Sequence, residues 1–453
     1  MKDLRLLQEQ DIHQLIEQKK IAELKDYLIR LNPVDLAELM EELDQPSALL
    51  VLRILPRELG VEAFAYMEVD KQKRLASLIT DAELKSILEE LYFDDMIDLL
   101  EEMPAEFVAD VLKNAPFERR ELINEFLKYP EDSAGSIMTI EYVDLKVDMT
   151  VAEAIDHIRE AGMTKETVYT CYVTSDFNEL VGIVSLRKLV TVDREKTIGQ
   201  IMDKEIITVG TLDDQEDVVE VFKKYDFLAV PVVDGELHLT GIVTVDDIME
   251  VIEEEATEDF QKMAAIAPTE EEYLDAGVLT LAKNRLPWLL VLMISGTFTA
   301  AIIRGYEDVL AQVAILSTFV PMLMDTGGNA GSQSSTLIIR GIAIGEIKLK
   351  DIFKVMKKET AIAIICGLIL AVVNFFRLVL IENADSSVAF VVSATLVFTV
   401  LMAKLIGGAL PLAAKKLHAD PAIMAGPLLT TIVDVGSLII YFIFATRFLN
   451  LHG

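Results

Sequence analysis

The sequence predicts a multidomain membrane protein, with an all-α helical-repeat domain, a tandem α/β pair and a five-helix transmembrane domain. Composition is the first observation: 52% of the 453 residues are hydrophobic, yet the net charge is −33, a mixture that no single soluble domain explains. The second is charge distribution, because residues 275–453 hold 14 Lys and Arg against 11 Asp and Glu, whereas residues 1–274 hold 27 against 63. An acidic soluble half therefore precedes a hydrophobic, nearly neutral half.

The composition also excludes several classes of protein. So acidic a surface repels nucleic acid phosphates and attracts cations. Cys171 and Cys366 are the only cysteines, which excludes a disulfide framework and a cysteine-rich metal site. Residues 1–18 are charged and lack an apolar core, so we expect no signal peptide and a cytoplasmic soluble half.

The first expected domain, residues 1–130, reads as a series of short helices. Apolar residues recur there at helical spacing, as in "DLAELMEELDQ" and "DAELKSILEELYFDDMIDLLEEM". Prolines at 33, 46, 56, 104 and 116 interrupt the pattern. Repeated short helices of this kind predict a curved helical solenoid, and no residue in it suggests catalysis.

An internal repeat follows the helical domain. "IMTIEYVDLKVDMTVAEAI" from Ile137 is echoed by "IMDKEIITVGTLDDQEDVV" from Ile201, and "GIVSLRKLV" at Gly182 by "GIVTVDDIM" at Gly241. Each copy predicts strand, helix, strand, strand and helix. The repeat resembles a tandem pair of CBS domains, which we expect at 131–199 and 200–255.

CBS pairs commonly bind adenine nucleotides, so the resemblance implies ATP as a modulator. The family's Thr and Asp, three residues apart, match Thr244 and Asp247, whereas the first copy has Ser185 and Lys188. One of the two nucleotide sites therefore departs from the pattern. The nucleotide-binding residues that the resemblance implies are Arg187, Phe227, Thr244 and Asp246.

Five apolar stretches are long enough to cross a bilayer, which takes about 20 residues. The connections after the second and fourth stretches are basic, for example at Lys348 and Lys415, and those after the first and third carry Glu307 and Glu382. The positive-inside rule then places the N-terminal half in the cytoplasm and the C-terminus outside the cell (inner) membrane. The five expected spans are 286–304, 310–339, 359–381, 388–412 and 421–447.

Polar residues interrupt the second and fifth spans. Asp325 and Asn329 fall near the middle of the second, within "PMLMDTGGNAGSQSS", and Asp434 falls near the middle of the fifth. An ionisable group at that depth usually marks an ion or substrate path. The alternative is helix packing through small residues, with Asp325 hydrogen-bonded to Asn329 one turn on. Carboxylate, amide and hydroxyl oxygens suit a hard cation, magnesium first.

The order of helical domain, CBS pair, connecting helix and five spans, with "GGNAGSQ" in the second span, resembles the MgtE family of magnesium channels. The resemblance covers essentially the whole chain. It implies a connecting helix at 256–282, a pore domain at 283–453 and a homodimer whose pore is lined by the second and fifth spans. Gly426 replaces an asparagine of some relatives. The implied pore residues are Asp434, Asn329, Gly328 and Thr430.

The resemblance also implies magnesium sensing by the cytoplasmic part. Magnesium bridging between crowded carboxylates would stabilise a compact arrangement and close the pore. The competing interpretation of any one carboxylate is a solvated acidic face. The regulatory metal ligands that the resemblance implies are Glu62, Asp94, Asp214, Glu216, Asp226, Asp247, Glu250, Glu255, Glu258, Asp259 and Asp420.

The sequence therefore predicts a magnesium channel or transporter in the lipid bilayer, and not an enzyme. Because no ATP-hydrolysing motif is visible, the ion should enter the cytoplasm down its electrochemical gradient. Two alternatives stay open: a membrane-anchored CBS-type cation or nucleotide sensor that acts on a partner, and a divalent cation exporter or exchanger.

Overall fold

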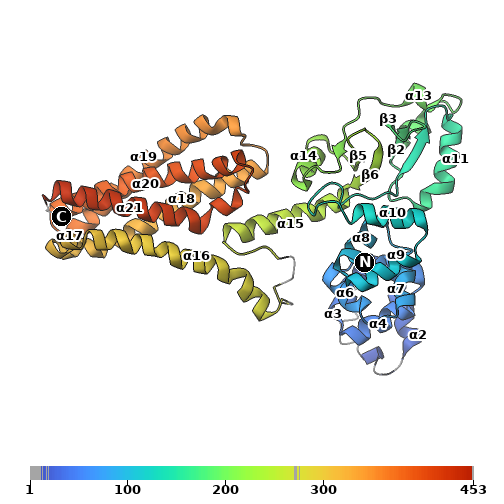
Figure 1. The fold of residues 1–453 in the computed structure, drawn as a ribbon, viewed down its shortest axis with the longest axis horizontal. Helices are drawn as coiled ribbons and strands as arrows, with labels where there is room; N and C mark the ends of the chain where they lie inside the picture. Colours follow the sequence, from blue (N-terminus) through green and yellow to red (C-terminus); the bar gives the residue numbers. More distant parts are fainter. Residues whose placement is uncertain are drawn as a thin grey trace. The chain divides into compact units, whose positions relative to one another are not determined.

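The protein divides into two compact units, residues 1–252 and 253–453 (Figure 1). This computed structural model describes residues 12–450 apart from 13, 17, 19, 270–272 and 275. Most of the N-terminal segment in which we expect no signal peptide lies outside the described residues.

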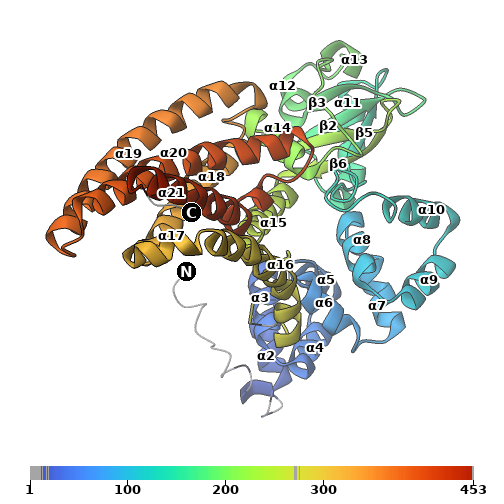
Figure 2. The same ribbon diagram turned by 60° about the vertical axis from the view of Figure 1, so that its left-hand side comes forward.

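The first unit begins with a row of short helices of eight to ten residues, and Figure 2 shows their curved succession. Proline or a polar side chain starts several of them: Asn32 Oδ1 accepts from the Val34 amide at 3.1 Å, and Thr80 and Glu83 form a capping box. The helices are α2 (Ile21–Leu28), α3 (Pro33–Glu42), α4 (Gln45–Ile54), α5 (Arg57–Ala65), α6 (Val69–Ala76), α7 (Asp81–Leu88), α8 (Phe93–Glu102), α9 (Ala105–Asn114) and α10 (Phe117–Phe126).

Helices two apart in this row pack on one another. α3 contacts α5, α4 contacts α6 and α6 contacts α8, an order of neighbours typical of stacked helical repeats. Their apolar faces bury Leu36, Met40, Phe64 and Met96 almost completely. The expected all-α helical-repeat domain is confirmed.

Two similar α/β repeats complete the first unit. In each, the first two strands are parallel and the last two antiparallel, with a register shift at the same place, between Val173 and Thr174 and between Val232 and Val233. The expected repeat is confirmed. The elements are β1 (Val143–Lys146), α11 (Val151–Ala161), β2 (Thr170–Thr174), β3 (Leu180–Ser185), α12 (Leu186–Thr191), α13 (Ile198–Ile201), β4 (Val209–Gly210), α14 (Gln215–Tyr225), β5 (Ala229–Val233), β6 (Leu239–Thr244) and α15 (Val245–Met263).

The segment preceding each repeat pairs with the last strand of the other repeat. Thr139 pairs with Ile242, and Asp203 pairs with Ile183. This exchange explains the repeated "IM" and "GIV" motifs. A Cβ at Gly241 would lie 2.7 Å from the Thr139 carbonyl oxygen, and one at Gly182 would lie 2.6 Å from the Met202 sulfur. A side chain at Gly241 would therefore force the exchanged backbone to shift.

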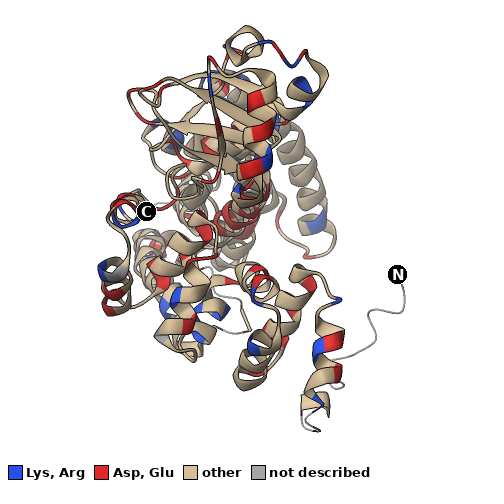
Figure 3. Ribbon diagram, turned by 90° about the vertical axis from the view of Figure 1, so that its right-hand side faces the viewer, with Lys and Arg blue, Asp and Glu red and all other residues tan. Residues whose placement is uncertain are grey.

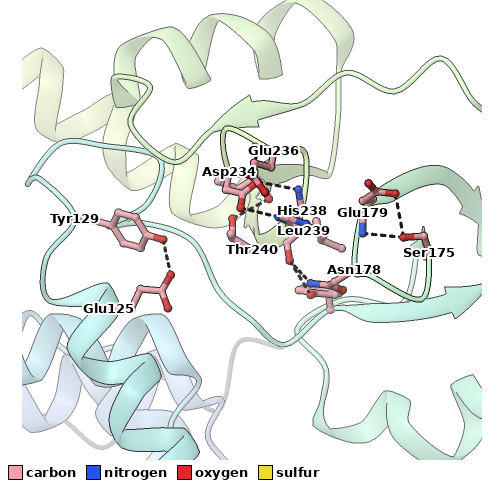
Figure 4. Close-up of polar contacts among 12 residues, drawn as sticks. Glu125, Tyr129, Ser175, Asn178, Glu179, Asp234, Glu236, His238, Leu239 and Thr240 are labelled. Atoms are coloured by element: carbon pink, nitrogen blue, oxygen red, sulfur yellow. Dashed lines mark hydrogen bonds and ion pairs between the residues drawn. The ribbon is translucent and has the colours of Figure 1, made fainter.

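The strand-connecting turns also join the two repeats. Asn178 Nδ2 of the first repeat donates to the Leu239 carbonyl of the second at 2.9 Å, and within the second turn His238 Nδ1 lies 2.9 Å from Asp234 Oδ2 (Figure 4). Buried Tyr172 packs with Leu239 and Ile242 between the sheets. The pair is therefore one packed structure, not two independent domains.

The described part of the second unit contains five long helices, and α18, α20 and α21 pack together in it (Figures 1 and 2). α16 packs on α21 and buries none of its own residues. Short turns precede α18 and α21, at Ala314–Phe319 and Ala422–Met424. The helices are α16 (Val278–Gly305), α17 (Glu307–Gln312), α18 (Val320–Ala343), α19 (Ile352–Leu380), α20 (Ser386–Lys416) and α21 (Gly426–Phe448).

Two expectations for this region need correction. The second span does not run over 310–339: its helix begins at Val320, with Pro321 in the first turn, where the missing N–H of proline is harmless. The connecting helix does not run over 256–282: α15 continues from the CBS pair to Met263, and α16 begins at Val278. Ala265 has a left-handed φ of 55°, which ends α15.

Four helices of the described chain are long and apolar enough to cross a membrane, within 278–305, 349–380, 386–416 and 422–448. α18 is the exception, because the polar residues and glycines of "DTGGNAGSQSS" lower its hydropathy. It nevertheless packs between α20 and α21. The expected membrane domain is confirmed, with four apolar helices and one polar helix against them.

The glycine beneath the exchanged segment gives a stability prediction. Gly241→Ala should destabilise the CBS pair by about 1–3 kcal/mol, because the added methyl overlaps the Thr139 carbonyl and the backbone must shift. Gly235→Ala is the matched control, since a Cβ there meets nothing within 4 Å. Thermal unfolding of the full chain measures both, and equal melting temperatures for the two variants would contradict the packing argument.

Candidate functional site

The membrane unit presents a polar stripe on α18. Asp325, Asn329 and Gln333 recur every fourth residue, and all three are exposed in the single chain. Asn329 Nδ2 donates to Asp325 Oδ1 at 3.1 Å. A carboxylate and amides on one helix face supply oxygen atoms to which a hard cation binds.

The opposite side of the same turns is close-packed. A Cβ at Gly327 would lie 2.8 Å from both Thr399 and Val433, and one at Gly328 would lie 3.0 Å from Thr430 Cγ2. The glycines therefore bring α18 against α20 and α21, as the packing interpretation expects. The Asn329–Asp325 hydrogen bond also agrees with that interpretation, and the ion path along the exposed polar residues stays a prediction.

Asp434 lies on α21 beside this polar stripe. It is half-buried, and the charge of Asp325 acts on it. Thr430, one turn earlier, donates its hydroxyl hydrogen to the Pro427 carbonyl at 2.9 Å. The structure thus brings Asp434, Thr430 and Gly328 together around the contact of α18 and α21, with Asn329 on the adjoining exposed face.

The carboxylates outside the long apolar helices fall into separate groups. In the first unit, Asp94 and Asp95 start α8, Asp246 and Asp247 start α15, and Glu166 faces them. Figure 3 shows acidic residues, in red, on many elements of the chain. Glu62 acts electrostatically on Tyr92, as Asp94 and Glu166 also do. The structure therefore gathers Glu62, Asp94 and Asp247, which sequence reasoning singled out.

Burial and then mutual repulsion raise the pKa values of three carboxyl groups in this group. Burial, followed by the charges of Asp246 and Asp247, raises the pKa of Glu166 to about 8. Burial and then Asp247 raise the pKa of Asp95 to about 7. Burial and the same Asp247 raise the pKa of Asp94 well above its usual range. Glu166 Oε2 is buried without a hydrogen-bond partner in the described part of the chain.

Sequence reasoning missed Asp95 and Glu166 in this group. Asp95 directly follows Asp94, so its adjacency was a usable signal. Glu166 stands in the first repeat, far from the others in sequence, and only the fold brings it here. Within the described residues, no three His, Cys, Asp or Glu side chains are close enough to hold a metal ion.

A second acidic group forms in the second unit, at the end of α15. Lys262 Nζ lies 2.6 Å from Glu258 Oε1 and 2.7 Å from Asp420 Oδ2. Asp420 Oδ1 also accepts from the Ala422 amide at 2.7 Å. Sequence reasoning missed Lys262, although its i, i+4 spacing from Glu258 was the available signal.

Asp259 belongs to the same group. Burial, and then the charges of Asp420 and Glu255, raise the pKa of Asp259 to about 6.

Gly426, at the start of α21, contacts the end of α15. It has a left-handed φ of 49°, and a Cβ there would lie 2.5 Å from the Met263 carbonyl oxygen. An asparagine at this position would need the end of α15 to move.

The remaining expected ligands are not brought together. Asp214 is the N-cap of α14, where its Oδ1 accepts from the Glu216 amide at 2.9 Å. Asp226 is the left-handed C-cap of the same helix. The 11 residues between them make a helix roughly 16 Å long, so in one chain these carboxylates cannot share an ion.

The expected nucleotide residues are partly assembled. Thr244 Oγ1 lies 2.5 Å from Asp246 Oδ1 and 2.6 Å from Asp247 Oδ2. Half-buried Phe227 stacks on Tyr225 with ring centroids 5.4 Å apart. Arg187 is exposed on α12 of the other repeat. Glu250 and Asp246, both on α15, act electrostatically on Asp95, so Thr244 and Asp246 adjoin the first acidic group.

Comparisons with known proteins agree with this architecture. Sequence profiles match the MgtE divalent cation transporter at 320–444, the MgtE intracellular N domain at 31–132 and CBS domains at 134–195 and 198–254. The magnesium transporter MgtE of Thermus thermophilus is 36% identical over 95% of this chain and 96% of its own length. That of Bacillus subtilis is 32% identical over 96% of each chain.

Solved structures resemble the first half of the chain. The soluble part of a magnesium transporter aligns with a TM-score of 0.51 and 32% identity, covering 54% of this chain and 96% of its own. The cytosolic domain of the Mg²⁺ channel MgtE in complex with ATP aligns with a TM-score of 0.51 and 33% identity, covering 54% of this chain and 100% of its own.

The first acidic group gives a pH prediction. Its carboxyls have folded-state pKa values above the unfolded ones, so the folded chain holds more protons in this range and its stability falls as pH rises from 4.5 to about 8. In magnesium-free buffer, the melting temperature should be lower at about pH 8 than at about pH 5. Glu166→Gln should reduce that difference by a few degrees.

Glu121→Gln, an exposed position on α10, is the control and should keep the full pH difference. Both variants are measured by thermal unfolding of the full chain without divalent cation. A Glu166→Gln protein with the same pH difference as the unaltered chain would show that the raised pKa does not affect stability.

Proposed function

The chain belongs to the MgtE family of divalent cation transporters, and we propose that it is a magnesium channel gated closed by Mg²⁺ binding to its acidic cytoplasmic domains. In this proposal Mg²⁺ enters the cytoplasm down its electrochemical gradient. One observation carries the proposal: the carboxylate of Asp434 lies beside an exposed polar stripe on a helix that is packed among apolar membrane helices.

The chemistry of that stripe favours magnesium. Carboxylate, amide and hydroxyl oxygens of Asp434, Asn329 and Thr430 are hard ligands, and no histidine or cysteine stands among them. Mg²⁺ keeps several of its waters and uses one or two carboxylates. Asp434 would hold the hydrated ion by its charge, with Asn329 and the backbone at Gly328 shaping the approach.

The exposed stripe also supports a homodimer. Exposed Asp325 and Asn329 are too polar to face lipid. Two copies facing each other across a two-fold axis would enclose both stripes and both Asp434 carboxylates around water. The basic connections at Lys348 and Lys415 support a cell (inner) membrane orientation with the N-terminal half in the cytoplasm and the C-terminus outside.

Gating follows from the two acidic groups. Carboxylates that repel each other without a cation favour separation of the segments that carry them, and a bound divalent ion favours their approach. The proposed regulatory ligands in the first unit are Glu62, Asp94, Asp247 and Glu250, and those in the second are Glu255, Glu258, Asp259 and Asp420. We also propose ligand roles for Asp214, Glu216 and Asp226, with other ligands from a second copy.

A nucleotide is proposed as a modulator. A relative's cytosolic domain was solved with ATP, and this chain has Thr244, Asp246 and Phe227 close together in its second repeat, with Arg187 exposed on the first. Because Asp247 contacts Thr244, a nucleotide there would alter the first acidic group. ATP would therefore change the magnesium dependence of closure.

The pore assignment gives the first prediction of this section. Asp434→Ala should abolish magnesium flux in proteoliposomes, and Asp434→Asn should be nearly as damaging, because the ion is attracted by charge. Asp308→Asn, at an exposed position of α17, is the control and should conduct normally. Normal flux through the alanine variant would remove Asp434 from the ion path.

The gating assignment gives the second prediction. Asp94→Asn combined with Asp247→Asn removes two ligands and should raise the magnesium concentration for half-maximal closure by about tenfold. Flux is measured while magnesium is varied on the cytoplasmic face. Glu38→Gln, exposed on α3, is the control, and closure at the same magnesium concentration in all three proteins would contradict the assignment.

A further inference from the structure

A buried polar cluster lies among α18, α19 and α20, away from the exposed stripe. It consists of Ser334, Glu359 and Lys404, whose exposed fractions are 1%, 6% and 5%. None of the three stands among the residues that the sequence analysis expects to bind an ion. Buried ionisable groups in a membrane helix are rare, and each needs a partner.

Short contacts join the cluster through the serine. Ser334 Oγ donates to Glu359 Oε2 at 2.5 Å. Lys404 Nζ donates to Ser334 Oγ at 3.3 Å and to the Ala330 carbonyl at 3.4 Å. Ser334 therefore stands between the carboxylate and the ammonium, and the ammonium also contacts the backbone of α18.

The three helices are in close contact at the same level. A Cβ at Gly407 would collide with the Gly331 carbonyl, and one at Gly408 would lie 3.2 Å from Glu359 Cγ. Glycines thus let α20 approach both α18 and α19, which is what allows Lys404 to reach the α18 backbone.

The buried charges of Glu359 and Lys404 stabilise each other, so neither is stable there alone. A single charge in hydrocarbon costs several kcal/mol, whereas a matched pair with hydrogen bonds loses much of that penalty. Removing one partner leaves the other buried and uncompensated. Replacing both by neutral residues is far less harmful.

The cluster acts on the part of α18 that carries the polar stripe. Ala330 and Ser334 each directly follow a residue of the stripe, Asn329 and Gln333. Successive residues of a helix are about 100° apart around its axis. A rotation of α18 about its axis that breaks the contacts of Ala330 or Ser334 therefore also moves the stripe. Three contacts on two successive turns resist such a rotation.

We propose that Glu359, Ser334 and Lys404 are positioning residues for ion permeation, which hold α18 at the rotation that directs Asn329 and Asp325 into the ion path. The inference rests on the proposed channel function. They bind no ion themselves. Their contribution to conduction comes from the matched charges, and so it depends on the pair.

The test compares single and double neutralisation in proteoliposomes. Glu359→Gln and Lys404→Met should each lower maximal magnesium flux per folded protein by about ten- to a hundredfold and raise the half-saturating magnesium concentration. The double variant Glu359→Gln/Lys404→Met should recover most of both quantities. Lys358→Met, an exposed neighbour, is the matched control and should behave as the unaltered chain.

Ser334→Ala keeps the proposal testable if a single-charge variant fails to fold. It removes one hydroxyl, and we expect a smaller loss of flux with a raised half-saturating concentration. Unchanged values per folded protein in the Ser334→Ala and single-charge variants would overturn the proposal, as would a double variant no better than either single one. Absence of flux through the unaltered chain would instead contradict the channel function.

Discussion

Asp434 is the constraint on which the membrane unit depends, because a carboxylate deep in a membrane helix needs water, a cation or a counter-charge beside it. The neighbouring α18 provides a polar surface in place of lipid. Its polar residues lie exposed on one face, while glycines on the other bring it against α20 and α21. The helix is too polar to face lipid all round, and in the channel that we propose its amide and carboxylate side chains would face a hydrated path.

The same electrostatic rule applies in the cytoplasmic half, with water more accessible. Glu166, Asp95 and Asp94 are partly buried beside other carboxylates, and their raised pKa values show how strongly each disfavours its charged form. At the end of α15, the positive charge of Lys262 compensates the negative charges of Glu258 and Asp420, with which it forms ion pairs. In the gating that we propose, segments that carry such groups would respond to an added divalent ion.

Much of the fold was predictable because it depends on periodicity and composition. The helical domain, the two α/β repeats and the membrane helices follow from apolar spacing, an internal repeat and long apolar runs. The start of the second span at Val320 was missed, because residues 310–319 are mostly apolar and their composition does not distinguish them from the membrane helix that follows. The break at Ala265 was missed because a single left-handed residue has no composition signal.

The site was predictable only where a group is unusual for its place in the sequence. Asp434 and Asn329 stood out against an apolar background, and Asp94 and Asp247 matched a family pattern. Glu359 and Lys404 were hidden, one beside a basic connection and the other alone in an apolar run. Ser334 connects the two charged side chains only when the three helices are packed together, so the sequence alone does not reveal the cluster.

The central claim is that this chain alone conducts magnesium passively. The most direct test is magnesium flux into proteoliposomes of the purified protein, without ATP or a sodium gradient, while the membrane potential is varied. We expect uptake to increase as the interior becomes more negative and net flux to vanish at the magnesium equilibrium potential. Uptake that requires a sodium gradient, or no uptake at any potential, would contradict the account.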